Sequence, residues 1–230
     1  NDFLKRDFIY PISEKKDEAI NWLKGHEVFF AKPNDGQCGK NIEKINTKEW
    51  KEDYEKLYVH LIENKLELLE EPVIQCEEMN KLNPSSVNTT RMVSVVNDAG
   101  EVTILTTFLR IGNGKFVDNI NSGGMFTPIN IDTGIIEFPA ADKDGNIYEK
   151  HPLTNVSIVG FKIPLWEECI KLVNEAAFVV PSVRYVGWDI AITNEGPVFI
   201  EANPFPGHDI YQIPIHTPDK IGVMPRFEKL

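Results

Sequence analysis

Two apolar stretches joined by a short polar turn constrain the fold of this chain most strongly. Residues 187–207 read GWDIAITNEGPVFIEANPFPG, a pattern that predicts a β-hairpin. If NEG forms a three-residue loop with Gly196 in the left-handed conformation, Thr193 pairs with Pro197. Counting back two residues at a time then places Asp189 directly opposite Glu201.

The polar residues of this hairpin carry the first functional hypothesis. Period-two alternation puts Asn203 on the same sheet face as Asp189 and Glu201. Two carboxylates this close repel each other, and the oxygen donors suit Mg²⁺ completed by water and phosphates. The alternative interpretation is that Asp189 and Glu201 are partly exposed acids paired with lysine or arginine. The spacing alone leaves both open.

Composition excludes several classes of protein. The 230 residues are 42% hydrophobic with a formal charge of −11 and contain no basic run, so nucleic acid is not an expected partner. No stretch of about 18 apolar residues and no signal-peptide pattern occurs, so we expect no stable membrane insertion and a cytoplasmic location. The three cysteines are far apart in sequence and are expected to be reduced thiols. The sequence leaves the oligomeric state open.

The periodicities predict an α+β protein of two lobes. The first lobe is expected over residues 26–72, with an apolar strand ending at Lys32, a glycine-containing loop and a strand at residues 42–45. A helix over residues 47–64 presents one apolar face: Trp50, Tyr54, Leu57, Tyr58 and Leu61. An earlier helix is expected from Ser13, as N-cap, to Lys24, with Gly25 as its stop.

The second lobe is expected over residues 73–230. Residues 66–75 are predicted as a strand that leaves the first lobe, and residues 91–112 as a hairpin around the turn NDAG. Residues 113–160 stay unassigned because Gly, Asn, Asp and Pro dominate them. Residues 164–178 predict a helix whose inward positions are Trp166, Ile170, Val173 and Ala177.

Lys32 is the second candidate functional residue. It closes an apolar strand where the chain opens into the loop NDGQCGK, and it could reach a phosphate there. Gly36 and Gly39 would allow the backbone to approach a ligand closely, and Lys40 adds a second cation. The loop is not a Walker A motif, and a hairpin turn with a solvated strand-end lysine is the simpler interpretation.

In order along the chain, these pieces resemble an ATP-grasp enzyme. More narrowly, KPNDGQCGK, LNPSSVNTTRMVSVV, LRIGNGKFVDNINSGG, HPLTN, FKIPLWEE and the final hairpin resemble the sugar-transfer-associated ATP-grasp family, over about residues 27–213. The end of the motif also resembles ligases that add glutamate, and Glu77 is spaced as in D-alanine-type ligases. The implied fold has two lobes with nucleotide between them and lacks most of the preceding α/β domain, as in part of a longer chain. The resemblance therefore implies that residues 1–25 are a remnant of that domain or a linker.

The resemblance implies a role for each candidate residue. Lys32 contacts nucleotide phosphates, and Arg91 and Arg110 lie near the γ-phosphate and an acyl-phosphate intermediate. One or two Mg²⁺ ions are implied at Asp189, Glu201 and Asn203. The implied flap is Gly36, Gln37, Gly39 and Lys40, although Cys38 and Asn41 stand where the family has small residues. The implied adenine and ribose contacts are Glu70, Glu71, Val73 and Glu77, with Glu78 as the alternative for the ribose. The implied substrate side is Asn119, Asn121, Gly123 and Gly124.

The residues also agree in kind with this chemistry, because an arginine fork suits an oxygen that gains charge during phosphoryl transfer. An arginine paired with one of the 35 acids is the simpler alternative. His151 has no assigned role. The implied activity is an ADP-forming ligase that activates a sugar-linked or small carboxylate with ATP and joins it to an amine. A kinase-like phosphotransferase and a non-catalytic nucleotide-binding module remain the alternatives.

Overall fold

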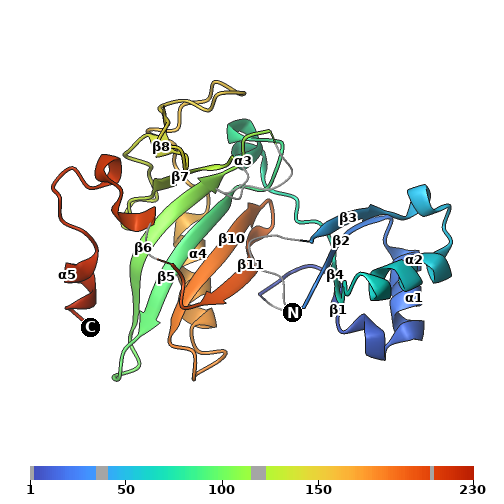
Figure 1. Ribbon diagram of the computed structural model, residues 1–230. Helices are drawn as coiled ribbons and strands as arrows, with labels where there is room; N and C mark the ends of the chain where they lie inside the picture. Colours follow the sequence, from blue (N-terminus) through green and yellow to red (C-terminus); the bar gives the residue numbers. More distant parts are fainter. Residues whose placement is uncertain (1–2, 35–40, 115–122, 208–209) are drawn as a thin grey trace. The chain divides into compact units, whose positions relative to one another are not determined.

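The protein is described here by a computed structural model covering residues 3–34, 41–114, 123–207 and 210–230. Contacts divide the chain into two compact units (Figure 1). The first unit is Lys5–Val73, and the second is Ile74–Leu230 together with Phe3 and Leu4. The change of unit after Val73 falls one residue beyond the predicted end of the first lobe.

The first unit is a four-stranded antiparallel sheet with two helices. The strand order is β1–β4–β2–β3. Its elements are β1 (Phe8–Ile9), α1 (Lys16–Gly25), β2 (Val28–Lys32), β3 (Glu43–Asn46), α2 (Tyr54–Glu63) and β4 (Leu68–Glu70), with 3-10 turns η1 (Ile12–Glu14) and η2 (Thr47–Trp50). Both helices pack on the same side of the sheet (Figure 1). Leu23, Phe29, Leu57, Leu61 and Leu69 are fully buried in the core between them.

Residues before Gly25 belong to this core, unlike the remnant or linker that the sequence suggested. Strand β1 pairs with β4, and Ile12, Ala19 and Leu23 are fully buried. The expected N-cap at Ser13 is wrong, because η1 intervenes and α1 begins at Lys16 without a side-chain cap. The backbone N–H of Ser13 instead donates to Glu67 Oε2.

The helix expected over residues 47–64 is broken. Lys51 and Glu52 have φ values of +54° and +58°, so the chain turns between η2 and α2. Asp53 then caps α2, its carboxylate accepting a hydrogen bond from the backbone N–H of Lys56 at 3.1 Å. The predicted apolar face is present, since Leu57, Tyr58 and Leu61 are buried. The periodicity of the apolar residues therefore did not indicate the turn at Lys51 and Glu52 or the N-cap at Asp53.

The second unit is a seven-stranded antiparallel sheet in the order β11–β10–β5–β6–β7–β8–β9. Its strands are β5 (Thr89–Val96), β6 (Val102–Ile111), β7 (Met125–Pro128), β8 (Ala140–Ala141), β9 (Ile147–Tyr148), β10 (Tyr185–Thr193) and β11 (Gly196–Pro204). The remaining elements are α3 (Glu77–Leu82), α4 (Trp166–Ala176), η4 (Ile210–Gln212), η5 (Pro214–His216) and α5 (Met224–Phe227). The strand expected over residues 66–75 is shorter in the structure. Only β4 (Leu68–Glu70) forms there, and α3 begins at Glu77.

The two faces of this sheet differ in chemistry. Helix α4 packs behind the central strands (Figure 1), and Cys169, Leu172 and Val173 join the strand residues Trp188 and Ile190 in one apolar core. Burial raises the pKa of the Cys169 thiol to about 12, so it stays protonated in that core. The other sheet face carries the charged residues Arg91, Arg110 and Asp189, and we call it the polar face.

The β10–β11 hairpin has the expected Asp189–Glu201 pairing by a different route. Thr193 pairs with Gly196 and not with Pro197, so the turn is one residue shorter than expected. The register then shifts between Ile190, which faces Phe199, and Asp189, which faces Glu201. A β-bulge at Ile200 thus absorbs one residue and restores the predicted pairing.

Among the residues that the structure describes, no helix has the length and apolar character needed to cross a membrane.

Candidate functional site

The polar face is organised by Asp189, which binds two arginines. Asp189 lies opposite Arg91 on β5, and Arg110 is on the same face of β6. Arg91 donates Nη2–H to Oδ2 at 2.7 Å and Nε–H to Oδ1, and Arg110 Nη2 forms an ion pair with Oδ2. The side chains of Asp189, Arg91 and Arg110 are 4%, 13% and 18% exposed. We call these three residues the arginine–aspartate cluster, which carries a net charge of +1.

Electrostatics keep Asp189 ionised. Burial alone would raise the pKa of its carboxyl, but the Arg110 charge and the hydrogen bonds and charge of Arg91 lower this pKa below its usual value. The carboxylate in turn fixes two guanidinium groups on one face. Asp189 is therefore paired with arginine, as in the alternative interpretation, but it is buried and not partly exposed. Both strand arginines have this acid as a partner.

Glu201 and Asn203 complete the set expected to bind magnesium. Glu201 is exposed, and no hydrogen bond or ion pair of its carboxylate occurs within the described parts of the chain. Asn203 faces Gly187 and donates Nδ2–H to its carbonyl at 3.5 Å. Carboxylate and amide oxygens suit Mg²⁺, so the residue types and register fit such an ion. Asp189 differs from a simple ligand because guanidinium groups already bind both of its oxygens.

Gly187 makes room for the arginine–aspartate cluster. A Cβ atom at this position would lie 2.7 Å from Pro206 Cβ and 3.1 Å from Arg91 Nη1. The absence of a side chain therefore lets the Arg91 guanidinium group pass close to Gly187 where it binds Asp189. This residue was part of the quoted motif, but the sequence alone gave no reason for it.

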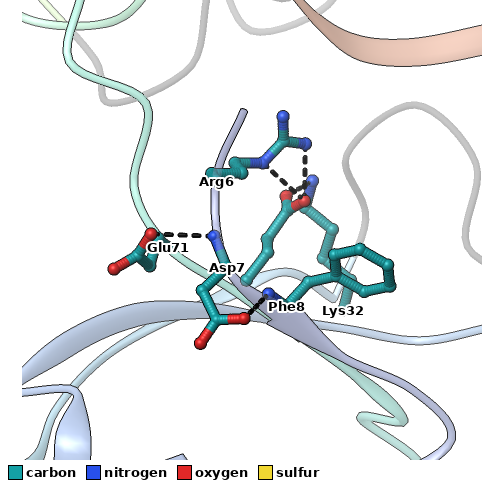
Figure 2. Close-up of polar contacts among 6 residues, drawn as sticks. Arg6, Asp7, Phe8, Lys32 and Glu71 are labelled. Atoms are coloured by element: carbon teal, nitrogen blue, oxygen red, sulfur yellow. Dashed lines mark hydrogen bonds and ion pairs between the residues drawn. The ribbon is translucent and has the colours of Figure 1, made fainter. Parts of the chain in front are cut away.

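Lys32 belongs to a second ionic cluster, within the first unit (Figure 2). Glu70 on β4 uses both of its carboxylate oxygens. Its Oε2 accepts hydrogen bonds from Arg6 Nε at 3.1 Å and Arg6 Nη2 at 2.7 Å, and its Oε1 forms an ion pair with Lys32 Nζ. The side chains of Arg6 and Glu70 are 6% and 9% exposed, and that of Lys32 is 21% exposed. Lys32 is thus the most accessible charge of this lysine–glutamate–arginine cluster. Sequence reasoning missed Arg6 because it placed residues 1–25 outside the lobe.

Other residues expected to contact the nucleotide have local partners. Glu71 accepts a 2.8 Å hydrogen bond from the backbone N–H of Asp7 and lies 3.3 Å from His26 Nε2. Glu77 is exposed in the first turn of α3 and pairs with Lys81 at 3.3 Å. Val73 is half-buried, and Glu78 is exposed. The flap residues Gly36, Gln37, Gly39 and Lys40, with Cys38, lie outside the described residues.

The expected substrate-side residues are only partly described. Asn119 and Asn121 lie outside the described residues, whereas Gly123 and Gly124 precede β7. His151 is 1% exposed. Its Nδ1 accepts hydrogen bonds from the backbone N–H groups of Leu153 and Thr154 at 3.2 and 3.3 Å. Its Nε2–H donates to the Gly112 carbonyl at 2.8 Å. These three contacts anchor the ring on backbone groups and give His151 a structural role in holding the end of β6.

A buried amide network near the same strand end was also missed. Gln75 Nε2 donates to the carbonyls of Asn83 and Ser86, and Gln75 Oε1 accepts from Asn88. Asn88 Oδ1 in turn accepts from the Gly112 backbone N–H at 3.3 Å. The density of amides and serines in the sequence between Gln75 and Asn88 is the signal that could have indicated it. The network thus holds Gly112, the residue that directly follows β6 and lies two residues after Arg110.

Comparison with solved structures identifies the class of fold. The chain matches N5-carboxyaminoimidazole ribonucleotide synthetase, solved in complex with ADP, with a TM-score of 0.51 and 15% identity over 92% of this chain and 44% of that one. D-Alanine–D-alanine ligase from Bacillus anthracis matches with a TM-score of 0.49 and 13% identity, over 99% of this chain and 62% of that one. D-Alanine–D-alanine ligase from Helicobacter pylori matches with a TM-score of 0.48 and 11% identity, over 90% of this chain and 50% of that one.

These solved enzymes have ATP-grasp domains, and the first match establishes that fold here. The chain spans 44% to 62% of the lengths of these three proteins. No curated protein matches the sequence.

The family follows from the sequence itself. The family described as sugar-transfer associated ATP-grasp matches residues 9–226, which is nearly the whole chain. The protein belongs to this family, and the resemblance drawn from its motifs is confirmed.

Proposed function

We propose that the chain is the nucleotide-binding part of a Mg·ATP-dependent, ADP-forming ligase that converts a carboxylate to an acyl phosphate and joins it to an amine. The observation that carries the proposal is the arginine–aspartate cluster, in which one buried carboxylate holds two guanidinium groups on one sheet face. Family membership supports the use of ATP. A carboxylate on a sugar-linked molecule is the proposed substrate class, in keeping with the family description.

The chemistry assigns roles to residues already described. The substrate carboxylate oxygen attacks the γ-phosphorus, the bond to the β-phosphate oxygen breaks, and ADP leaves. Arg91 and Arg110 are proposed to stabilise the negative charge that accumulates on the transferred phosphoryl group, because fixed guanidinium donors need no reorganisation during the reaction. Lys32 is proposed to hold the nucleotide phosphates.

The second step consumes the acyl phosphate. The amine nitrogen attacks the acyl carbon, the carbon–oxygen bond to phosphate breaks, and the nitrogen loses a proton. Glu201 and Asn203, with Asp189, are the residues proposed to hold Mg²⁺, which when bound would draw charge from the β- and γ-phosphates. The steps need no covalent intermediate with the protein, so we expect positioning to supply most of the rate.

Trapping with hydroxylamine tests this proposal without knowledge of the natural amine. The protein is incubated with Mg·ATP, hydroxylamine and a panel of sugar acids, and hydroxamate and ADP are measured together. Equal amounts of both products, lost in Arg110→Lys, support acyl phosphate formation. A stable phosphoester without hydroxamate would favour the kinase-like alternative.

Calorimetric titration of Mg·ATP is the companion measurement. Micromolar binding that weakens about tenfold, or about 1.4 kcal/mol, in Glu201→Gln and Lys32→Ala is the expected result. Glu195→Gln, in the exposed β10–β11 turn, is the matched charge control. ATP binding without ADP formation from any acceptor would favour the non-catalytic alternative, and the absence of binding by the wild type would contradict the proposal.

A further inference from the structure

A cavity of about 490 Å³ lies within the second unit, on the polar face of the large sheet. Its floor includes Thr106 and Phe108 of β6 and Phe126 of β7. Its walls include residues 128–132, Glu137, Phe138 and part of the C-terminal segment between Ile210 and Arg226. The C-terminal segment runs beside β6 (Figure 1), where Arg226 Nη1 donates to the Leu105 carbonyl at 2.6 Å. This volume is typical of a site for a small molecule.

The strand register joins this cavity to the arginine–aspartate cluster. Phe108 is the cross-strand partner of Arg91, and Phe126 is the cross-strand partner of Arg110. Directly paired residues of antiparallel strands point to the same face, with Cβ atoms about 5 Å apart. The aromatic floor of the cavity therefore continues the surface that carries the two guanidinium groups, and a ligand seated there would border the proposed reaction centre.

The lining favours a ligand with an apolar body. Phe108 and Phe126 are buried, and Phe126 meets the His216 ring edge to face, with centroids 5.6 Å apart. Nε2 of His216 lies 2.9 Å from the Pro139 carbonyl, and burial lowers the pKa of this histidine, so the ring is neutral near pH 7. The aromatic part of the cavity thus presents π-faces without a positive charge.

The polar part of the lining favours a cation. Among the described residues that line the cavity, three are acids, Asp132, Glu137 and Asp219, and one is an arginine, Arg226, whose Nη1 already donates to a backbone carbonyl. The Asp132 carboxylate has no partner within the described residues. Thr106, which is 6% exposed, also has a buried hydroxyl that lacks a hydrogen-bond partner there. An acidic rim above aromatic faces attracts an ammonium group and repels a carboxylate.

We propose that this cavity binds the amine co-substrate of the ligation, a small molecule with an apolar or ring-shaped body and a protonated amine. The inference rests on the proposed function and divides the sheet face into two roles. Arg91 and Arg110 receive the anionic, phosphorylated substrate, while the cavity beside them receives the cationic partner. The ammonium releases one proton to solvent before its nitrogen attacks the acyl carbon and phosphate leaves.

The test uses three probes of the same size in the absence of nucleotide. Benzylamine, benzyl alcohol and benzoate carry positive, zero and negative charge on one ring, and saturation-transfer NMR titrations with the full chain give their affinities. We expect benzylamine to bind most tightly and benzoate most weakly. Asp132→Asn/Glu137→Gln/Asp219→Asn, which keeps the shape of all three side chains, is expected to weaken benzylamine binding at least fivefold.

Glu149→Gln/Glu168→Gln/Glu195→Gln is the matched control, because it removes three exposed acids that do not line the cavity. We expect it to change benzylamine binding by less than twofold. Benzoate binding as tightly as benzylamine, or equal losses in the two triple variants, would overturn the inference. Because nucleotide is absent, the result is separate from the calorimetric test: benzylamine binding without ATP binding supports the cavity and contradicts the ligase, and the reverse contradicts only the cavity.

Discussion

Replacing Asp189 by asparagine is the most informative perturbation of the second unit. The substitution keeps the shape of the side chain but removes the negative charge that both Arg91 and Arg110 contact. Two guanidinium groups, 13% and 18% exposed, would then face each other across a neutral amide. Removing one partner of a buried ion pair costs about 3–5 kcal/mol, and the residual water access of both arginines places the expected loss near the lower end, about 3 kcal/mol.

Urea unfolding at pH 7 measures this loss. With a slope of about 3 kcal/mol per molar urea, the midpoint should fall by about 1 M. Hydrogen exchange of peptides from β5 and β10 assigns the change to the second unit, since these strands carry Arg91 and Asp189. Phosphate should stabilise Asp189→Asn more than the wild type, because the variant leaves a larger surplus of positive charge.

Glu201→Gln is the control for this prediction. It also replaces a carboxylate by the amide of the same shape, at the cross-strand neighbour of Asp189. Glu201, however, is exposed and lacks a partner within the described chain. We expect its free energy of unfolding to change by less than about 0.5 kcal/mol. A midpoint shift in Asp189→Asn no larger than that of Glu201→Gln would refute a buried ionic cluster held by Asp189.

Three further predictions concern other parts of the structure. Glu70→Gln should lower the free energy of unfolding by about 2–4 kcal/mol in a urea titration, because it removes the carboxylate charge that both Arg6 and Lys32 contact. Exposed Glu63→Gln is the control and should be near neutral. The pKa of His216 is lowered by burial, so its contribution to stability is present above about pH 6.5 and is lost as the pH falls toward its folded pKa. Melting temperatures between pH 7.5 and 5.5 should therefore fall more in the wild type than in His216→Gln, and parallel curves would contradict this. Gly187→Ala should push Arg91 or Pro206 away, lowering stability by about 1–3 kcal/mol in a urea titration. Gly25→Ala should not lower it, because the added Cβ would face open space.

The sequence predicted the fold where periodicity was strong. The strand ending at Lys32, the long β5–β6 hairpin and the helix from Trp166 are all present. The Asp189–Glu201 pairing was also right, although the turn was counted one residue too long and a bulge at Ile200 compensated. The alternation of apolar residues does not indicate a bulge. The residue that was wrongly counted in the turn and the residue that the bulge adds therefore cancelled.

Partners that are distant in sequence could not be predicted in this way. Arg6 and Glu70 are 64 residues apart, and Arg91 and Asp189 are 98 apart. Each arginine had many possible acids in a chain with 35 of them. The sheet order selects the partner, because β5 lies between β10 and β6 and brings Arg91 and Arg110 to the same carboxylate.

The hydrogen-bond capacity of Asp189 separates its role from that of Glu201. A carboxylate offers about four lone-pair directions, and in Asp189 two N–H groups of Arg91 and one of Arg110 already use three. While these bonds persist, Asp189 can offer a cation at most one direction, whereas Glu201 can offer both oxygens. Asp189 is therefore suited to positioning the arginines and Glu201 to supplying the main anionic ligand. On this argument, Glu201→Gln should weaken Mg·ATP binding without affecting folding, and Asp189→Asn should impair both.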